Sequence, residues 1–201
     1  GRNILAETNA FQLVLDENQV KGLPQSVLDS AREQSKAADK GADKYLFTLH
    51  KPSMLPVLTY AQDRSVREQI YKAYLKRGDN GNENDNKAVI ADMVSLRYEK
   101  AKLLGYDSYS HYVTANQMAG SPEAAYELLE GIFDAANQKA KEELDRMTTL
   151  FKRDHGADAN FESWDWWYYA EKVRNRDYKL EEEQVRQFLS LDNVKGGIFF
   201  L

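Results

Sequence analysis

The sequence predicts a mainly helical protein, with a multi-helical body, a long central helix and a small two-stranded β element near the N-terminus. From Ser53 onward, apolar residues recur at spacings of three and four, which is the period of an amphipathic helix. After Ser121 one such apolar stripe continues for about seven turns. Only two short segments near the start of the chain alternate with period two, as half-buried strands do.

The two expected strands are residues 11–15 and 45–49, which are rich in the aromatic and branched side chains that favour strands. Between them, Pro24 is expected to open a helix that ends near residue 40, with Gly22 and Gly41 as flanking breaks. One helix therefore lies beside a strand pair. The relative direction of the two strands cannot be read from the sequence.

Helices are then expected at residues 64–77, 85–104 and 109–116. Gly78 follows the first of them, and Gly105 stands where a helix C-cap belongs. Asn84 or Asp85 is expected to cap the start of the second helix, because short polar side chains accept hydrogen bonds from free backbone amides.

The longest helix is expected to start at Ser121, Pro122 and Glu123, which are an N-cap residue, a first-turn proline and an acid that complements the helix dipole. At 1.5 Å per residue it should be about 45 Å long. A loop (154–163), a helix (166–175) and two short helices after Leu180 and Asp192 should follow. The apolar stripe of the long helix contains Ala125, Leu128, Leu129, Ile132, Phe133, Ala136, Ala140, Leu144, Met147, Leu150 and Phe151. No repeat or linker marks a domain boundary, so residues 1–201 are expected to form a single helical body.

The composition of the 201 residues is that of a soluble globular protein, with 42% hydrophobic and 29% charged residues and a net charge of −5. Lys and Arg are mixed with Asp and Glu, so no nucleic-acid partner is expected. No apolar run reaches the roughly 20 residues that span a bilayer, so no membrane partner is expected. The absence of cysteine excludes thiolate chemistry but does not decide the compartment. We expect the cytoplasm, with the periplasm as the alternative.

The C-terminal end is apolar, with four large apolar residues at 198–201. Such a run would be exposed at a free terminus, so we expect it to belong to an element that continues in a longer protein. Self-association through this end is a further expectation. The alternative is a terminal helix that packs into its own core.

The ionisable residues do not form a recognisable catalytic or metal-binding motif. His50, His111 and His155 lie far apart in different predicted elements, and none has a second histidine one turn away. We therefore assign no catalytic residue and no metal ligand. Residues 79–86 are rich in Asp and Asn, which suggests calcium. Placing Gly81 sixth in a calcium loop would put Lys76 first, however, so a turn between helices is the preferred interpretation.

Residues 164–169 contain five aromatic side chains in six positions. They could line a groove that stacks on sugars, peptides or bases. The alternative, which composition favours, is a helix start whose rings anchor the core, with Ser163 or Asp165 as its cap.

Several short segments, in this order, resemble the thimet oligopeptidase, oligopeptidase A and peptidyl-dipeptidase family of zinc metallopeptidases. The strongest is Trp164-Asp165-x-x-Tyr168-Tyr169, and the Asn-rich turn with Trp164–Trp167 favours the bacterial peptidyl-dipeptidase (dipeptidyl carboxypeptidase) branch. The resemblance covers essentially the whole chain. The other matching segments are Asn9-Ala10-Phe11-Gln12-Leu13, Gly22-Leu23-Pro24, Phe47-Thr48-Leu49-His50-Lys51-Pro52, Arg64-x-x-Arg67-Glu68-x-Ile70-Tyr71-x-Ala73-Tyr74, Arg77-Gly78-Asp79-Asn80, Lys100-Ala101-x-Leu103-Leu104-Gly105-Tyr106, His111-Tyr112-Val113 and Leu191-x-x-Val194-x-x-Gly197.

This resemblance implies a two-lobed, zinc-dependent peptidase that hydrolyses short peptides and, in that branch, releases dipeptides from C-termini. The family's metal-binding motif follows the segment matched here. The chain is therefore expected to be a non-catalytic part of such an enzyme, without zinc of its own and with the remainder of the peptidase as its partner. Trp164, Trp167, Tyr168 and Tyr169 are expected to line the substrate channel. The alternatives are a stand-alone helical interaction module and a peptide-binding regulator.

Overall fold

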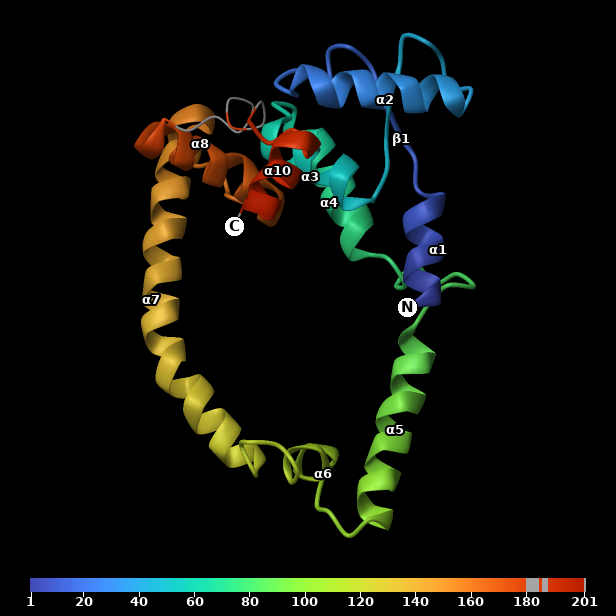
Figure 1. The fold of residues 1–201 in the computed structure, drawn as a ribbon, viewed down its shortest axis with the longest axis vertical. Helices are drawn as coiled ribbons and strands as arrows, with labels where there is room; N and C mark the ends of the chain where they lie inside the picture. Colours follow the sequence, from blue (N-terminus) through green and yellow to red (C-terminus); the bar gives the residue numbers. More distant parts are fainter. Residues whose placement is uncertain (180–184, 186–187, 201) are drawn as a thin grey trace. The chain divides into compact units, whose positions relative to one another are not determined.

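The computed structural model describes residues 1–179, 185 and 188–200 and is mainly helical, as predicted (Figure 1). A small two-stranded sheet lies near the N-terminus, also as predicted. None of the helices among the described residues combines the length and apolarity that crossing a bilayer requires. The elements are α1 (Arg2–Ala10), β1 (Leu13–Leu15), α2 (Gln25–Ala37), β2 (Tyr45–Phe47), α3 (Lys51–Tyr60), α4 (Arg64–Leu75), α5 (Lys87–Leu103), α6 (Tyr109–Thr114), α7 (Pro122–His155), the 3₁₀ helix η1 (Ser163–Asp165), α8 (Trp166–Tyr178) and α10 (Leu191–Phe200).

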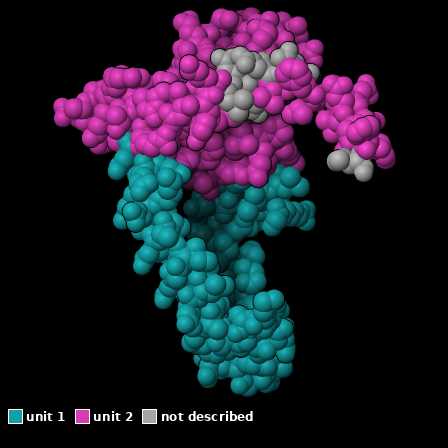
Figure 2. All heavy atoms as spheres, turned by 60° about the vertical axis from the view of Figure 1, so that its left-hand side comes forward, with its two compact units in different colours: residues 1–7, 76–145 teal, residues 8–75, 146–201 magenta. Residues whose placement is uncertain are grey.

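The chain divides into two compact units, which are coloured separately in Figure 2. Unit 1 contains Gly1–Glu7 and Lys76–Asp145, and unit 2 contains Thr8–Leu75 and Arg146–Leu201. No sequence pattern indicates this division, because two of the three changes of unit fall inside helices, in α1 and in α7, and the third coincides with the end of α4. The prediction that residues 1–201 are one part of a larger two-lobed enzyme stays a prediction.

The strand pair and three helices of unit 2 surround its main core. β1 and β2 are antiparallel, with Leu13 opposite Phe47 and Leu15 opposite Tyr45. Helix α2 packs on β2, and α3 packs on both α4 and α8. The buried side chains of this core are Leu15, Val20, Leu23, Ala31, Tyr45, Phe47, Leu49, Met54, Val57, Leu58, Ala61, Val66 and Ile70. Their burial provides the main driving force for folding this unit.

Several boundaries of the predicted elements need correction, including the ends of α6, at Thr114 rather than residue 116, and of α8, at Tyr178 rather than residue 175. The strands are shorter than expected, at Leu13–Leu15 and Tyr45–Phe47. Helix α5 begins at Lys87, after an Asn86 cap whose side chain makes no capping bond, although Asp85 Oδ1 accepts a hydrogen bond from the Lys87 amide at 2.9 Å. Helix α1 was not predicted, because its short, polar sequence carries no long apolar stripe.

Helix α7 begins as predicted, and Ser121 Oγ accepts a hydrogen bond from the amide of Ala124 at 3.1 Å. It extends four residues beyond Phe151, where Lys152, Arg153 and His155 complement the helix dipole. Only the end of its apolar stripe is buried, in a second cluster formed by Met147, Leu150, Phe151 and Tyr169. The helix expected near Asp192 is α10, and the one expected after Leu180 lies outside the described residues.

Candidate functional site

The aromatic segment begins in η1 and continues into α8. The first turn of η1 is stabilised by a reciprocal capping box. The Glu162 side chain accepts a hydrogen bond from the Asp165 amide, and Asp165 Oδ2 accepts one from the Glu162 amide at 3.0 Å. Asp165, one of the two predicted cap candidates, precedes α8 as its N-cap residue, but its side chain makes no capping bond to α8. The cap of η1 is Glu162 and not Ser163. The Asp165 carboxylate also has a second set of partners, which the sequence alone does not predict.

Asp165 is fully buried between two arginines of α4. Arg64 Nε donates to Asp165 Oδ1 at 3.0 Å and Arg64 Nη2 donates to Oδ2 at 2.8 Å, while Arg67 Nη2 donates to Oδ1 at 2.9 Å. Arg67 is only 1% exposed, and its Nη1 donates to the backbone oxygens of Ala61 at 2.7 Å and Gln62 at 3.2 Å. This cluster attaches the start of α8 to α4.

The charge state of Asp165 follows from two opposing influences. Burial is the largest, and it disfavours the ionised carboxylate. The hydrogen bonds from Arg64, Arg67 and the Glu162 amide together outweigh burial, so the pKa of Asp165 lies below its ordinary value. The carboxylate is therefore ionised at neutral pH and compensates the buried guanidinium of Arg67.

The four aromatic residues expected to line a channel lie in different surroundings. The Arg67 guanidinium stacks over the ring of Tyr168, 4.2 Å from its centroid, and the ring of Trp167 packs against Tyr71 at 5.9 Å. Trp164 lies edge-on to Tyr71, with its Nε1 buried and without an acceptor in the described part of the chain. Tyr169 is fully buried against Phe151, and burial raises the pKa of its hydroxyl.

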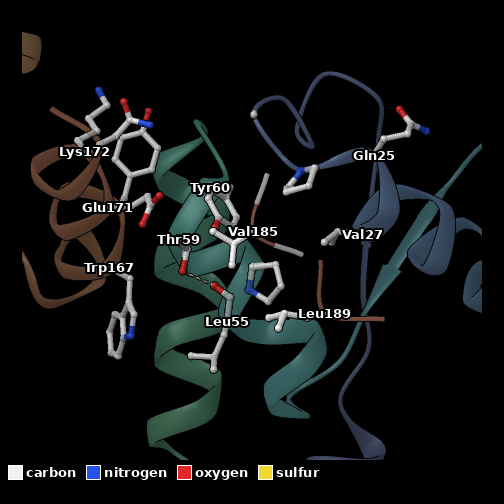
Figure 3. Close-up of a pocket in the computed structure, with 15 residues that line it drawn as sticks. Gln25, Val27, Leu55, Thr59, Tyr60, Trp167, Glu171, Lys172, Val185 and Leu189 are labelled. Carbon is white, nitrogen blue, oxygen red and sulfur yellow. Dashed lines mark hydrogen bonds between the residues drawn. The ribbon is translucent and has the colours of Figure 1, made fainter. Parts of the chain in front are cut away.

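A pocket of about 940 Å³ opens in unit 2 beside two of these rings (Figure 3). Helices α2, α3 and α8 form its walls, and Trp167 and Tyr168 line it whereas Trp164 and Tyr169 do not. Its lining residues are Gly22, Pro24, Gln25, Val27, Leu55, Pro56, Thr59, Tyr60, Trp167, Tyr168, Glu171, Lys172, Asn175, Val185 and Leu189. Whether this wall belongs to a substrate channel stays a prediction.

The charged groups on the wall of this pocket are paired. Lys172 Nζ donates to Asp154 Oδ2 at 2.6 Å, and Glu171 accepts from Arg174 Nε at 2.8 Å and Nη2 at 2.9 Å. Thr59 Oγ1 donates to the backbone oxygen of Leu55 at 2.8 Å, as the dashed line in Figure 3 shows. Because these charges are compensated locally, the pocket suits apolar or neutral groups better than ions.

Comparison with known proteins places this structure in a family. The model of peptidase family M3 matches residues 57–201, which include the arginines of α4 and the whole aromatic segment. The chain belongs to peptidase family M3. It is 33% identical to oligopeptidase A of Salmonella typhimurium, over 98% of this chain and 29% of that protein. It is 36% identical to the probable cytosolic oligopeptidase A of Arabidopsis thaliana, over 99% of this chain and 29% of that protein.

A third M3 relative is the dipeptidyl carboxypeptidase of Escherichia coli, 32% identical over 99% of this chain and 29% of that protein. The chain therefore spans about 29% of the length of these three relatives. The identities to the two oligopeptidases A are slightly higher than this one. They support the M3 family as a whole rather than the peptidyl-dipeptidase branch that the aromatic motif suggested.

The zinc ion implied by the resemblance to M3 peptidases needs converging nitrogen, oxygen or sulfur donors. His50 precedes α3, His111 lies in α6 and His155 ends α7. His111 Nδ1 is 2.8 Å from Ser108 Oγ, and its Nε2 is 3.4 Å from a Glu123 oxygen. Among the described residues, no group of three or more His, Asp or Glu could hold a metal ion. The donors described here do not fit zinc, so we derive no catalytic step through it.

The Asn-rich segment of this M3 chain forms the turn between α4 and α5, and Glu7 organises it. The Glu7 carboxylate accepts from the Gly78 amide, from Asn80 Nδ2 at 2.9 Å and from Asn82 Nδ2 at 2.8 Å. These hydrogen bonds lower the pKa of Glu7, and the bond from the Gly78 amide has the largest effect. Amide donors rather than oxygen ligands therefore converge in the turn, which favours the structural interpretation over calcium binding.

Proposed function

We propose that this chain is a non-catalytic, helical part of a zinc-dependent M3 peptidase that hydrolyses short peptides. Two findings support the proposal. The family model matches residues 57–201, and three relatives named as peptidases align with 98–99% of the chain. In this proposal the metal and its ligands belong to other parts of the longer protein, and this chain supplies scaffold and substrate-channel wall.

The observation that carries the scaffold role is the buried cluster of Arg64, Arg67 and Asp165. Asp165 follows Arg67 by 98 residues, and both lie within the stretch that the family model matches. An ion pair buried this completely fixes the position of one helix relative to another, because any displacement would leave a charge unpaired in the interior. It holds α8, with Trp167 and Tyr168, beside the pocket in unit 2.

A finer proposal is that the parent enzyme releases dipeptides from the C-termini of its substrates. The alignment with the dipeptidyl carboxypeptidase of Escherichia coli supports it, as does the resemblance of the aromatic motif to that branch. Of the four aromatic residues, we propose only Trp167 and Tyr168 as channel-wall residues, since both line the pocket. The natural substrates in this proposal are short peptides, with the cytoplasm as the expected compartment.

The test compares the natural full-length gene product that contains this sequence with the 201-residue chain alone. We expect the full-length protein to cleave a quenched-fluorescent peptide, to lose this activity on chelation and to regain it with Zn²⁺. The chain alone should show no chelator-sensitive cleavage. Cleavage by the chain alone, or inactivity of the zinc-loaded full-length protein, would contradict the proposal.

Mass spectrometry of the products tests the finer proposal. Stepwise loss of two residues from a peptide with a free C-terminus would support dipeptide release, and amidation of that terminus should then slow cleavage. Internal fragments of varied length, formed equally well from free and amidated peptides, would support an oligopeptidase instead.

A further inference from the structure

The first turns of α7 expose a continuous apolar surface. We call it the α7 apolar face and define it as Tyr126, Leu128, Leu129, Ile132 and Phe133. Each of these side chains is between 58% and 67% exposed. At 100° per residue they fall within an arc of about 160° on one side of the helix. Five adjacent large apolar side chains on one helix face are more than the scattered exposed residues of an ordinary surface.

The same helix shows what such a face does where it has a neighbour. Met147, Leu150 and Phe151 continue the spacing of three and four along α7, and all three are buried with Tyr169 of α8. The stripe therefore has the composition of a helix-packing surface from its beginning to its end. The first part of the stripe is exposed and the last part is buried, although both consist of large apolar residues at the same spacing.

The charge beside the α7 apolar face indicates the chemistry of what would cover it. Between Pro122 and Gln138 the helix carries the acids Glu123, Glu127, Glu130 and Asp134 and no Lys or Arg. These four acids fall within about 60° of one another, along one border of the apolar arc. Glu123 also faces His111. A surface that is apolar in the middle and acidic along one edge complements an amphipathic helix with Lys or Arg beside its own apolar face.

We propose that the α7 apolar face docks a basic amphipathic helix supplied by another part of the longer M3 polypeptide. The relatives reported above are more than three times as long as the stretch aligned with this chain, which covers 29% of each. A segment of the same polypeptide is present at a high effective concentration and needs no separate partner. The proposal rests on the proposed role of this chain as part of a longer peptidase.

The experiment places a charge in the α7 apolar face and measures thermal unfolding of two proteins, the natural full-length product and the 201-residue chain. The variants are Leu129→Asp and Ile132→Asp, and the matched control is Gln138→Asp, on the opposite side of the same helix. The control carries the same helix-propensity cost of Asp. We expect the two face variants to lower the unfolding temperature of the full-length product by about 3 °C or more beyond the control. In the chain alone, the unfolding temperatures of the face variants and of the control should agree within about 1 °C.

A charge-reversal arm tests the basic character of the partner. Glu130→Lys with Asp134→Lys should lower the unfolding temperature of the full-length product at low salt, and added salt should reduce the difference from wild type. The same pair in the chain alone should have no comparable effect. An equal effect of the reversal in both proteins would contradict a basic partner.

Three results would overturn the proposal. The first is that the face variants lower the unfolding temperature of the full-length product no more than the control does. The second is that the natural product contains no polypeptide beyond this chain. A chain dimer dispersed by Ile132→Asp, with no effect in the full-length product, would assign the face to a second copy. Failure of the proposed function is seen separately, because a full-length protein that cleaves no peptide can still show the stability difference.

Discussion

The two units of this chain use the same kind of sequence in different ways. In unit 2, β1, β2, α2, α3 and α4 bring their apolar side chains into one core. In unit 1, α5 has apolar residues around much of its circumference, yet among its residues only Ala101 is buried. A helical period of apolar residues therefore predicts a helix in both units. It predicts burial only where another element supplies the opposing surface.

Helix α7 contains this comparison within a single element. Phe133 belongs to its exposed part in unit 1, and Phe151 belongs to its buried part in unit 2. Phe151 packs edge-on against Phe161 at 5.5 Å and Tyr169 at 5.4 Å between ring centroids. The two phenylalanines thus differ in their neighbours while sharing residue type and helix.

Replacing each of these phenylalanines by alanine should give the largest contrast. Phe151→Ala removes a fully buried ring and should lower the free energy of unfolding of unit 2 by about 3–5 kcal/mol. Phe133→Ala should change the stability of the chain by about 0.5 kcal/mol or less, since its ring is mostly in solvent. Chemical denaturation followed by tryptophan fluorescence reports unit 2, because all three tryptophans lie between residues 164 and 167, and far-ultraviolet circular dichroism follows the helices of both units. Equal effects of the two variants would remove the distinction between the units.

The sequence predicted local features well and distant contacts poorly. Ser121, Pro122 and Glu123 marked the start of α7, and Gly105 was correctly placed after α5, where its positive φ of 79° suits glycine. These features depend on residues within one turn of each other. The antiparallel pairing of the strands, the division into units and helix α1 depend on packing between distant segments, which no local pattern contains.

The candidate site shows the same limit. The sequence predicts Asp165 as a helix cap and Trp167 and Tyr168 as channel wall, but it does not predict the arginine partners of Asp165. One signal was present: Arg64 and Arg67 are three residues apart, so both guanidiniums lie on one face of α4. Two cations on a face that also carries the buried Ile70 need an anion nearby. That anion lies about a hundred residues later, and only the fold identifies it.

Asp165→Asn should have the next largest effect. The asparagine keeps the size of the side chain but leaves the buried guanidinium of Arg67 without a compensating charge, so unit 2 should lose about 3 kcal/mol of stability. Asp158→Asn, the same change at an exposed position of unit 2, should cost no more than about 0.5 kcal/mol. Denaturation at neutral pH, again followed by tryptophan fluorescence, measures both. A mild effect of Asp165→Asn would mean that the cluster contributes little to holding α8.

The pH dependence sharpens this prediction. Because the folded-state pKa of Asp165 is lower than its unfolded-state pKa, the carboxylate stabilises the fold fully above the unfolded value of 3.8. This stabilisation is lost as the pH falls through the lower, folded-state pKa. The stability difference between wild type and Asp165→Asn should therefore narrow from about pH 5 toward pH 3. A difference that stays constant over this range would show that the charge is not responsible.

Gly22→Ala and Gly81→Ala test the comparison between the units at the backbone. Both glycines have positive φ, 90° at Gly22 in unit 2 and 66° at Gly81 in unit 1, so each alanine carries a conformational cost of about 1 kcal/mol. A Cβ at Gly22 would also meet the backbone oxygen of Tyr60, whereas a Cβ at Gly81 would have open space around it. Gly22→Ala should therefore destabilise unit 2 by about 2 kcal/mol or more.

The same denaturation experiment, followed by circular dichroism so that unit 1 is also reported, should show a loss of only about 1 kcal/mol for Gly81→Ala, because its methyl group would meet no other atom. The oxygen that a Gly22 methyl group would meet is backbone at the end of α3, and the adjacent Gln62 amide donates to the Lys21 oxygen at 2.9 Å. Relieving the clash between this methyl group and the Tyr60 oxygen would thus require the loop before α2 to move away from α3. Both the loop and α3 line the pocket, so its wall would change. If Gly22→Ala proved as mild as Gly81→Ala, that wall would be loosely packed, and the contrast between the two units would be confined to their side chains.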